Sequence, residues 1–295
     1  MILIDGKKVS DEIKHELTEK VKSKKEEIGK VPGLVTILVG DNPASQSYVT
    51  MKGKACEQLG MFSILEKYNS DMTESELLNL VEKYNNDERI HGILVQLPLP
   101  KHINEDKIIE AINPAKDVDG FHPINMGNLV IGKDAFYPCT PYGILELIRR
   151  YNIETKGKHC VVVGRSNIVG KPIANIMLQK KDGANCIVTV CHSAAKDLSK
   201  YTKDADILIA AIGSPNFITG DMVKEGVVVI DVGINRVEEK TAKKGYKLVG
   251  DVDFETVAEK SAFFTPVPGG VGPMTIAMLM KNTYTAFCRL NKISE

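Results

Sequence analysis

The sequence predicts an α/β protein with parallel sheets, divided into two domains. Apolar runs of strand length alternate with amphipathic helical segments along both halves of the chain. This alternation is typical of parallel strands joined by right-handed helical crossovers. At 295 residues the chain is longer than most single domains. In its second half, residues 160–172 read as a buried strand, a tight turn and a helix.

The first part of the chain predicts helices and strands in strict alternation. Apolar residues recur every four positions from Val9 to Val21, which indicates a surface helix with one apolar stripe. Thr73 and Glu76 form a capping box that begins a later helix. The other expected elements are strands over 34–39, 62–65 and 90–96 and a helix over 44–59. This order predicts a three-stranded parallel sheet.

Residues 113–138 break this alternation. The stretch is rich in Asn, Pro, Gly and Asp, and we expect it to be irregular. A loop of that length is either functional or a linker.

The second part of the chain predicts another parallel sheet. Thr140 and Pro141 begin a helix over 144–151, and a helix over 168–179 follows the turn at Gly164. Strands are expected over 160–163, 187–190, 207–210 and 227–231, with one more near 263 and a last helix over 276–290 that returns to the first domain. The predicted domains are therefore residues 1–138 with 274–295, and residues 139–273, the second being Rossmann-like.

Composition excludes several classes of protein. Lys plus Arg and Asp plus Glu both number 38, so there is no basic excess of the kind that favours nucleic acid or a membrane surface. The six cysteines form no C-x-x-C pair, which favours buried thiols over disulfides or a metal site. The sequence shows no signal segment and no apolar run of membrane-spanning length. We therefore expect a cytoplasmic protein without a metal.

The turn after the strand at 160–163 is a candidate phosphate site. Backbone N–H groups at a helix start, together with the helix dipole, favour an anion. The spacing here is G-x-S-x-x-x-G, with Gly164, Ser166 and Gly170, and not the usual G-x-G-x-x-G of dinucleotide-binding domains. Taken alone, the loop fits a nucleotide site and an ordinary strand-to-helix turn equally well.

The end of the next strand points to the type of nucleotide. NAD-binding domains usually place an Asp or Glu there for the ribose hydroxyls, but this chain has Cys191, His192 and Ser193. The absence of an acid, with Arg165 nearby, suits the 2′-phosphate of NADP. His192 by itself fits a structural role better than a catalytic one.

Several polar residues of the first domain are candidates for chemistry. Tyr48 and Lys52 are four apart on a predicted helix and share a face. Gln96 ends a strand, where open α/β sheets bind ligands. Asp117 and Asp119 lie in the loop that follows. Each has a simpler interpretation. Tyr48 would pack at the edge of its helix with a solvated Lys52 nearby, and Gln96 would only cap the end of a strand. The two aspartates would form hydrogen bonds within a turn.

Taken together, these segments resemble one family. The sequence contains VGDNPASQSYVTMKGKAC, VQLPLP, KDVDGFHP, VVVGRSNIVGKP, CHS, DVGIN and TPVPGGVGPMT, in that order from residue 34 to 275. They closely resemble the bifunctional methylenetetrahydrofolate dehydrogenase/methenyltetrahydrofolate cyclohydrolase family, and the resemblance covers nearly the whole chain.

The resemblance implies roles for individual residues. In the folate site, Tyr48 would stack on the aminobenzoyl group, Lys52 would act as acid or base with Gln96 hydrogen-bonded to it, and Asp119 would hold the pterin. NADP would bind through Gly164, Arg165, Ser166 and Ser193, with Ile234 near the nicotinamide. The loop Pro268, Gly269 and Gly270 would border the folate.

The resemblance also implies the reaction and its setting. The enzyme would oxidise 5,10-methylenetetrahydrofolate with NADP and hydrolyse the methenyl product to 10-formyltetrahydrofolate, in one-carbon metabolism and purine biosynthesis, as a homodimer. Two alternatives stay open. One is a shikimate-type dehydrogenase of similar plan. The other is a non-catalytic NADP- or folate-binding regulator, against which the intact set of Tyr48, Lys52, Gln96 and Asp119 argues.

Overall fold

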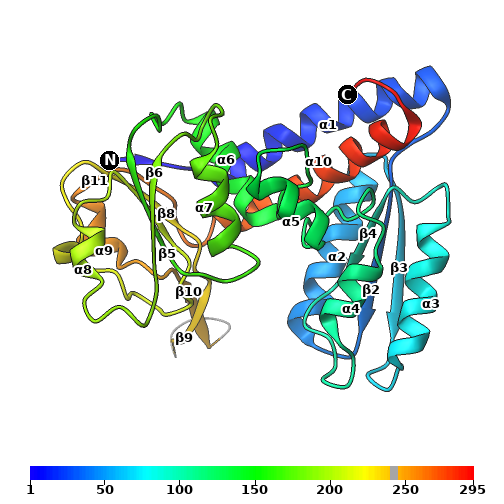
Figure 1. Ribbon diagram of the computed structural model, residues 1–295, viewed down its shortest axis with the longest axis horizontal. Coiled ribbons are helices and arrows are strands. Elements are labelled where there is room, and N and C mark those ends of the chain that lie inside the picture. Colours follow the sequence, from blue (N-terminus) through cyan, green and yellow to red (C-terminus); the bar gives the residue numbers. More distant parts are fainter. Residues whose placement is uncertain (240–244) are drawn as a thin grey trace. The chain divides into compact units, whose positions relative to one another are not determined.

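The computed structural model describes residues 1–239 and 245–295. The chain forms two compact units, which we name by their parallel sheets (Figure 1). The three-stranded unit comprises residues 11–139 and 276–295, and the six-stranded unit comprises residues 1–10 and 140–275.

The sheet of the three-stranded unit is parallel, as predicted, in the order β3-β2-β4. Its strands are β2 (Gly33–Val39), β3 (Phe62–Tyr68) and β4 (Gly92–Val95), and every residue of β2 and β4 is buried. Strands covered on both faces have continuous apolar sequences of this kind. In β3 exposed residues alternate with partly buried ones, so its last three residues lack a continuous apolar run and the predicted strand ended at residue 65.

Helices connect and cover this sheet. α2 (Pro43–Gln58) joins β2 to β3, and α3 (Glu74–Asn85) joins β3 to β4. The predicted capping box is confirmed: Glu76 N–H donates to the Thr73 hydroxyl at 3.2 Å, and Thr73 N–H donates to the Glu76 carboxylate at 2.8 Å.

From residue 276 onward, the last helix belongs to the three-stranded unit, as predicted. α10 (Val271–Asn291) begins five residues before the predicted start, with Gly272 and Pro273 in its first turn. Asn282 Nδ2 donates to the carbonyls of Val118 and Tyr137 at 2.8 and 3.0 Å. α1 (Gly6–Ile28) contributes Lys20, whose ammonium lies over the Tyr284 ring.

The stretch from 113 to 138 is less irregular than predicted. It follows α4 (Glu105–Ala111) and contains α5 (Pro123–Val130). Pro123 occupies the first turn of α5, where a missing N–H costs nothing. The His122 ring caps the helix, accepting from Ile124 N–H at 3.1 Å.

The six-stranded unit has the strand order β1-β11-β8-β7-β5-β6, all parallel. The strands are β1 (Ile2–Leu3), β5 (His159–Val163), β6 (Ile187–Cys191), β7 (Ile207–Ala210), β8 (Val227–Asp231) and β11 (Ser261–Phe264). Its helices are α6 (Cys139–Arg150), α7 (Gly170–Leu178), α8 (Ser199–Thr202), η1 (Gly220–Met222) and α9 (Phe254–Ala258), and β9 (Asn235–Glu238) pairs with β10 (Tyr246–Val249) in a hairpin.

The N-terminus differs from the predicted domain division. β1 pairs with β11, so residues 1–10 lie in the six-stranded unit and not with the segment that follows them. Ile4 N–H extends this pairing by donating to Phe264 O at 2.8 Å. A two-residue strand at a chain end has too little pattern for sequence analysis to assign its partner.

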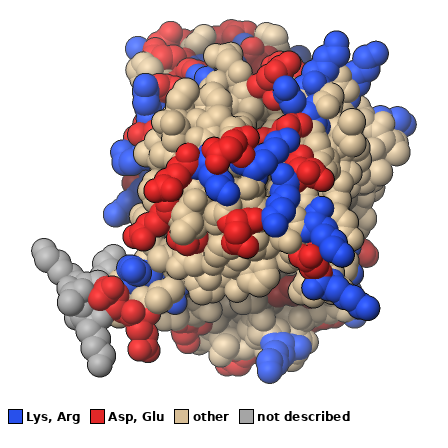
Figure 2. All heavy atoms as spheres, turned by 90° about the vertical axis from the view of Figure 1, so that its left-hand side faces the viewer, with Lys and Arg blue, Asp and Glu red and all other residues tan. Residues whose placement is uncertain are grey.

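The placement of the charged residues and the cysteines agrees with what the composition indicates. On the face shown in Figure 2, acidic and basic side chains are interspersed. All six cysteines are buried, as expected, and none is in a disulfide. Within residues 1–239 and 245–295, no helix combines the length and apolar character that crossing a bilayer requires.

Buried His91 gives the three-stranded unit a specific pH dependence. Gly33 N–H donates to His91 Nδ1 at 3.0 Å, and burial, helped by Lys116 and Lys30, lowers the pKa of His91 to about 4. In the unfolded chain the His91 ring is protonated below about pH 6.5, so the free energy of unfolding falls as the pH drops from about 6.5 to 4, by roughly 3 kcal/mol.

His91→Gln should reduce this pH dependence. Urea unfolding of the variant should show a smaller difference in the free energy of unfolding between pH 7 and pH 4 than the wild type shows. The exposed control His15→Gln should keep the full difference, and an unchanged difference in His91→Gln would contradict the assignment.

Candidate active site

A buried lysine and a glutamine form the centre of the candidate site. Lys52, in the third turn of α2, is only 7% exposed, and its Nζ donates to Gln96 Oε1 at 2.9 Å. Gln96 directly follows β4. Its backbone N–H donates to Ile37 O at 2.8 Å, and its Nε2 donates to Leu97 O at 2.7 Å. Because both of these donors are engaged, the amide oxygen is held toward Lys52.

Tyr48 lies one helical turn before Lys52. It is 39% exposed, although aromatic side chains usually bury most of their surface. Residues four apart on a helix share a face, so an exposed ring and a buried ammonium group are presented side by side. This arrangement suits a flat ligand that stacks on one residue and reacts beside the other.

Asp117 and Asp119, which sequence analysis could not separate, have different environments. Asp117 is buried and its carboxylate accepts from the backbone N–H groups of Gly120, Phe121 and His122 at 3.1, 3.3 and 2.9 Å. Asn125 Nδ2 adds a fourth hydrogen bond at 2.8 Å. Asp117 therefore has the turn-forming role that was the simpler interpretation of both residues.

Asp119 instead lies within electrostatic range of Lys52. Burial raises the pKa of Asp119, the charge of Lys52 opposes this shift, and Asp117 adds to it. Burial also raises the pKa of the neighbouring Cys139 thiol, to which the Asp119 charge contributes. The structure thus brings Lys52, Gln96 and Asp119 together from α2, the end of β4 and a loop.

The turn after β5 is built for close backbone approach. Gly164 has φ +133°, and a Cβ there would lie 2.2 Å from Ala211 O. A Cβ on Gly170 would lie 2.3 Å from Gly164 O. Ser166 Oγ accepts from the N–H groups of Val169 and Gly170, both at 3.2 Å, which explains why α7 begins two residues after the predicted start. The Ser166 hydroxyl group can still donate its own hydrogen to a phosphate oxygen.

The two residues expected to select the nucleotide are exposed. Arg165 follows Gly164, and Ser193 follows the end of β6. His192 Nδ1 accepts from Ala194 N–H at 3.3 Å, in keeping with the structural role expected for this histidine. Exposed cationic and hydroxyl groups beyond the carboxyl ends of β5 and β6 form a surface suited to a phosphate.

The remaining predicted residues also lie in the six-stranded unit. Ile234, just before β9, is 50% exposed. In the loop after β11, Gly269 has φ +109° and its carbonyl accepts from Lys7 N–H at 3.0 Å. Gly270 packs closely on Pro266 and Thr265, and Pro268 precedes the pair. Gly269 is favoured by its positive φ, and Gly270 is needed because a Cβ there would lie 2.6 Å from Pro266 O.

Two buried aspartates of this unit, Asp231 and Asp251, were not among the predicted site residues. Each accepts hydrogen bonds from three backbone N–H groups. Each also has a glycine within two residues, in the segments DVG and GDV, which is the available sequence signal. Burial raises the pKa of Asp231 to about 6, and the backbone hydrogen bonds oppose that shift.

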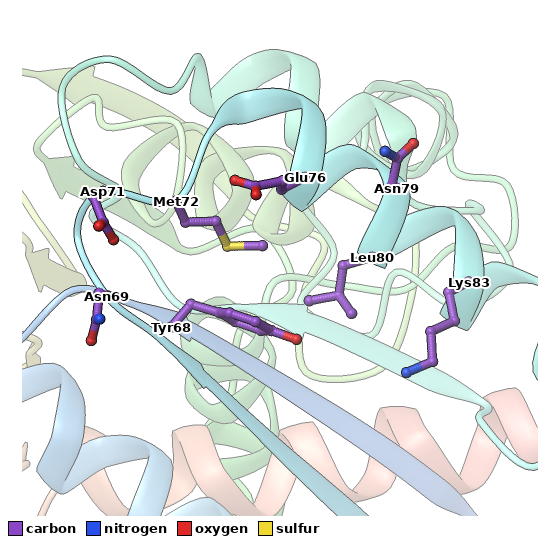
Figure 3. Close-up of a pocket in the computed structure, with 8 residues that line it drawn as sticks. All are labelled: Tyr68, Asn69, Asp71, Met72, Glu76, Asn79, Leu80 and Lys83. Carbon is purple, nitrogen blue, oxygen red and sulfur yellow. The ribbon is translucent and has the colours of Figure 1, made fainter.

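A separate hollow lies beside α3 (Figure 3). Its volume is about 560 Å³. The residues lining it are Tyr68, Asn69, Asp71, Met72, Glu76, Asn79, Leu80 and Lys83. None of the predicted site residues is among them.

Two family models match the chain. The model described as tetrahydrofolate dehydrogenase/cyclohydrolase, catalytic domain, matches residues 4–119. The model for the NAD(P)-binding domain of the same family matches residues 138–291. The chain belongs to the tetrahydrofolate dehydrogenase/cyclohydrolase family. The first match contains Lys52, Gln96 and Asp119, and the second contains the turn at Gly164.

Relatives of this tetrahydrofolate dehydrogenase/cyclohydrolase match it end to end. "Bifunctional protein FolD" of Chlorobium chlorochromatii is 61% identical over 293 residues, covering 99% of both chains. The solved bifunctional enzyme FolD of Campylobacter jejuni is 52% identical, with a TM-score of 0.92 over 98% of this chain and 99% of that one. The Trypanosoma brucei enzyme, solved with NADP cofactor and inhibitor, is 39% identical, with a TM-score of 0.92 over 98% of each chain.

The shikimate-type alternative has a counterpart among the solved structures. Shikimate 5-dehydrogenase of Thermus thermophilus has a TM-score of 0.51 at 14% identity, over 87% of this chain and 99% of that one. That likeness concerns the fold alone. Membership of the folate family decides between the two dehydrogenase readings.

Proposed function

We propose that Lys52, Gln96, Tyr48 and Asp119 form the folate site of a bifunctional enzyme. The enzyme oxidises 5,10-methylenetetrahydrofolate to the methenyl form with NADP and hydrolyses that product to 10-formyltetrahydrofolate. The observation that carries the proposal is the 2.9 Å hydrogen bond from buried Lys52 to Gln96, with the Asp119 carboxylate within electrostatic range of Lys52. A lysine so placed has a fixed direction and little competing water.

Tyr48 and Asp119 bind and orient the substrate. The exposed Tyr48 ring stacks on the aminobenzoyl group, since aromatic pairs favour offset-stacked contact. The Asp119 carboxylate accepts hydrogen bonds from the ring N–H and amino group of the pterin. Hydrogen bonds to a charged acceptor are stronger than neutral ones, and they fix which face of the folate meets Lys52.

Lys52 moves a proton in the hydrolytic step. Water adds its oxygen to the cationic methenyl carbon, and a neutral Lys52 amine accepts the proton that the water loses. The hydroxyl group of the adduct then gives up its proton as its oxygen forms the formyl C=O, the carbon–nitrogen bond to N5 breaks, N5 takes up a proton, and the formyl group stays on N10. Gln96 Oε1 accepts one Lys52 N–H, which turns the amine lone pair toward the site of addition.

The six-stranded unit has the features that NADP requires. Gly164 and Gly170 let the turn pack tightly against Ala211 O and on itself, the Ser166 hydroxyl group can donate its hydrogen, and exposed Arg165 and Ser193 suit the 2′-phosphate. NADP, when bound, supplies the hydride acceptor. Ile234 lines the nicotinamide position, and Pro268, Gly269 and Gly270 border the folate.

The activity is tested with the purified chain, 5,10-methylenetetrahydrofolate and NADP. We expect NADPH absorbance to rise and, in a separate assay, methenyltetrahydrofolate absorbance to decay faster than the spontaneous reaction. Binding of both ligands without turnover would support a non-catalytic binding protein instead.

Arg165→Ala should reduce NADP selectivity. Charge-assisted hydrogen bonds to the 2′-phosphate are worth roughly 1.5–3 kcal/mol, so NADP affinity should fall about ten- to a hundredfold. NAD affinity should change little, because NAD lacks that phosphate. Titration calorimetry with both nucleotides measures the two losses.

The matched control for this test is Lys180→Ala. It removes an exposed cation beyond the other end of α7 and should leave both affinities unchanged. Equal losses of NADP and NAD in Arg165→Ala would show that Arg165 does not recognise the phosphate.

The setting of the enzyme is a further part of the proposal. We place it in the cytoplasm, as a homodimer, with its formyl product used in purine biosynthesis. Family likeness supports the homodimer. So does strand β6, which pairs with β5 on one side and has Ile187 and Val190 exposed at 65% and 43%. Light scattering that gives the mass of one chain would contradict the dimer.

A further inference from the structure

Two buried carboxylates lie behind the loops at the carboxyl ends of β7 and β8. Asp231 is the last residue of β8, and Asp251 follows β10 by two positions. They are 2% and 0% exposed. Neither was assigned a part in the folate or nucleotide chemistry above. Buried carboxylates are retained only when their acceptor capacity is filled.

Asp251 holds the loop after β7. The backbone N–H groups of Ile212, Gly213 and Ser214 donate to its carboxylate at 2.6, 3.0 and 3.0 Å. Asn235 Nδ2 donates to the same carboxylate at 2.8 Å. One side chain therefore fixes three successive amides of one loop and the residue that follows Ile234.

Asp231 in turn holds Asp251. Its Oδ1 accepts from Asp251 N–H and from Gly233 N–H, both at 2.9 Å, and its Oδ2 accepts from Val252 N–H at 2.9 Å. A Cβ on Gly250 would lie 1.7 Å from Asp231 Oδ2. The two carboxylates form a chain of fixed acceptors with little room to shift.

The loop that Asp251 holds lines the nucleotide crevice. β5 has β6 on one side and β7 on the other, and the chain reverses direction across the sheet there. Open α/β sheets bind ligands at such a switch point. Ala211 O lies against Gly164, in the turn after β5. Arg165 and Ser193 lie on the β5 and β6 side, whereas residues 212–214 and Ile234 lie on the β7 and β8 side.

We propose that Asp251 is a positioning residue for the nicotinamide half of NADP. It acts by fixing residues 212–214 and Asn235, and through Asn235 the adjacent Ile234, on the β7 and β8 side of the crevice. This inference rests on the proposed function of the six-stranded unit. It assigns Asp251 no contact with the adenine half, which Arg165 and Ser193 hold.

The test is Asp251→Asn with two nucleotides and both activities. An amide offers one acceptor oxygen and puts an NH₂ group against backbone donors. We expect the KM for NADP to rise and the dehydrogenase kcat to fall, each roughly tenfold, since buried donors lose their partner. The affinity for adenosine 2′,5′-bisphosphate, which lacks the nicotinamide half, should change less than twofold. Methenyl hydrolysis should be unchanged, because Lys52 and Gln96, which carry that step, lie in the three-stranded unit.

Asp253→Asn is the matched control. It makes the same chemical change two residues away, where the carboxylate accepts from the Thr256 hydroxyl at 2.8 Å, and should leave every readout at the wild-type value. If Asp251→Asn is not recovered folded, Asn235→Ala carries the test, with the same pattern expected at smaller size.

Two results would overturn the inference. Wild-type NADP kinetics in the variant would show that the loop needs no help from Asp251. An equal loss of adenosine 2′,5′-bisphosphate binding would show that the whole nucleotide site had collapsed, which is a role in stability alone. Failure of the proposed function is distinguishable, because the wild-type chain itself would then fail to reduce NADP.

Discussion

Lys52→Met should slow methenyltetrahydrofolate hydrolysis by roughly 10²–10⁴-fold, the usual contribution of a general base. Methionine keeps an unbranched apolar stem in the buried position of Lys52 but removes the amine that takes the proton from water. Hydride transfer depends chiefly on holding the methylene carbon and the nicotinamide close together. Dehydrogenase activity should therefore fall by less. The decay of methenyl absorbance, corrected for the spontaneous reaction, and the formation of NADPH measure the two effects.

Lys54→Met is the matched control for this variant. Lys54 lies on the same helix, is exposed and occupies a different face. It should retain both activities. Undiminished methenyl decay in Lys52→Met would rule out Lys52 as the proton acceptor and leave its bond to Gln96 as a purely structural contact.

Asp119→Asn should abolish most folate binding while NADP binding persists. The substitution keeps the size of the side chain but places an NH₂ donor opposite the N–H donors of the pterin. Each buried donor left without an acceptor costs roughly 1–3 kcal/mol, so two such donors weaken binding by about thirtyfold or more. Fluorescence titration with a folate analogue, beside a titration with NADP, measures both affinities.

Asp117→Asn provides the contrast for Asp119→Asn. Burial raises the pKa of both carboxyl groups, so the contrast comes from their hydrogen bonds. Asp117 accepts from three backbone N–H groups, and Asp117→Asn should therefore lower the free energy of unfolding more than Asp119→Asn does. Normal folate turnover in Asp119→Asn would contradict the assignment of Asp119 to the pterin and would favour a turn-forming role for Asp119 as well as for Asp117.

The sequence predicted those parts of the fold that depend on local patterns. Continuous apolar runs identified β2 and β4, because strands buried on both faces leave no polar alternation. The capping box at Thr73 identified the start of α3 for the same local reason. The position of Gln96 at a strand end also followed from pattern, and with it a place at the ligand-binding edge of the sheet.

Other features depended on contacts between distant residues and could not be predicted. Asp117 and Asp119 are alike in sequence, and only the fold shows which carboxylate is filled by backbone donors. Asp231 and Asp251 meet through a glycine-lined turn, 20 residues apart. β1 is too short for any periodicity, and its parallel partner β11 stands near the other end of the chain.

The placement of Gln96 has a consequence for when the site is lost. Its backbone amide is bonded to Ile37 on β2, the central strand of the three-stranded sheet. An amide in a central ladder exchanges its hydrogen slowly, through openings that approach global unfolding, whereas surface loops open at far lower cost. The Lys52–Gln96 pair is therefore held by the most cooperative part of its unit. Partial fraying of loops and termini leaves the acid–base pair intact, and its disassembly coincides with melting of the sheet.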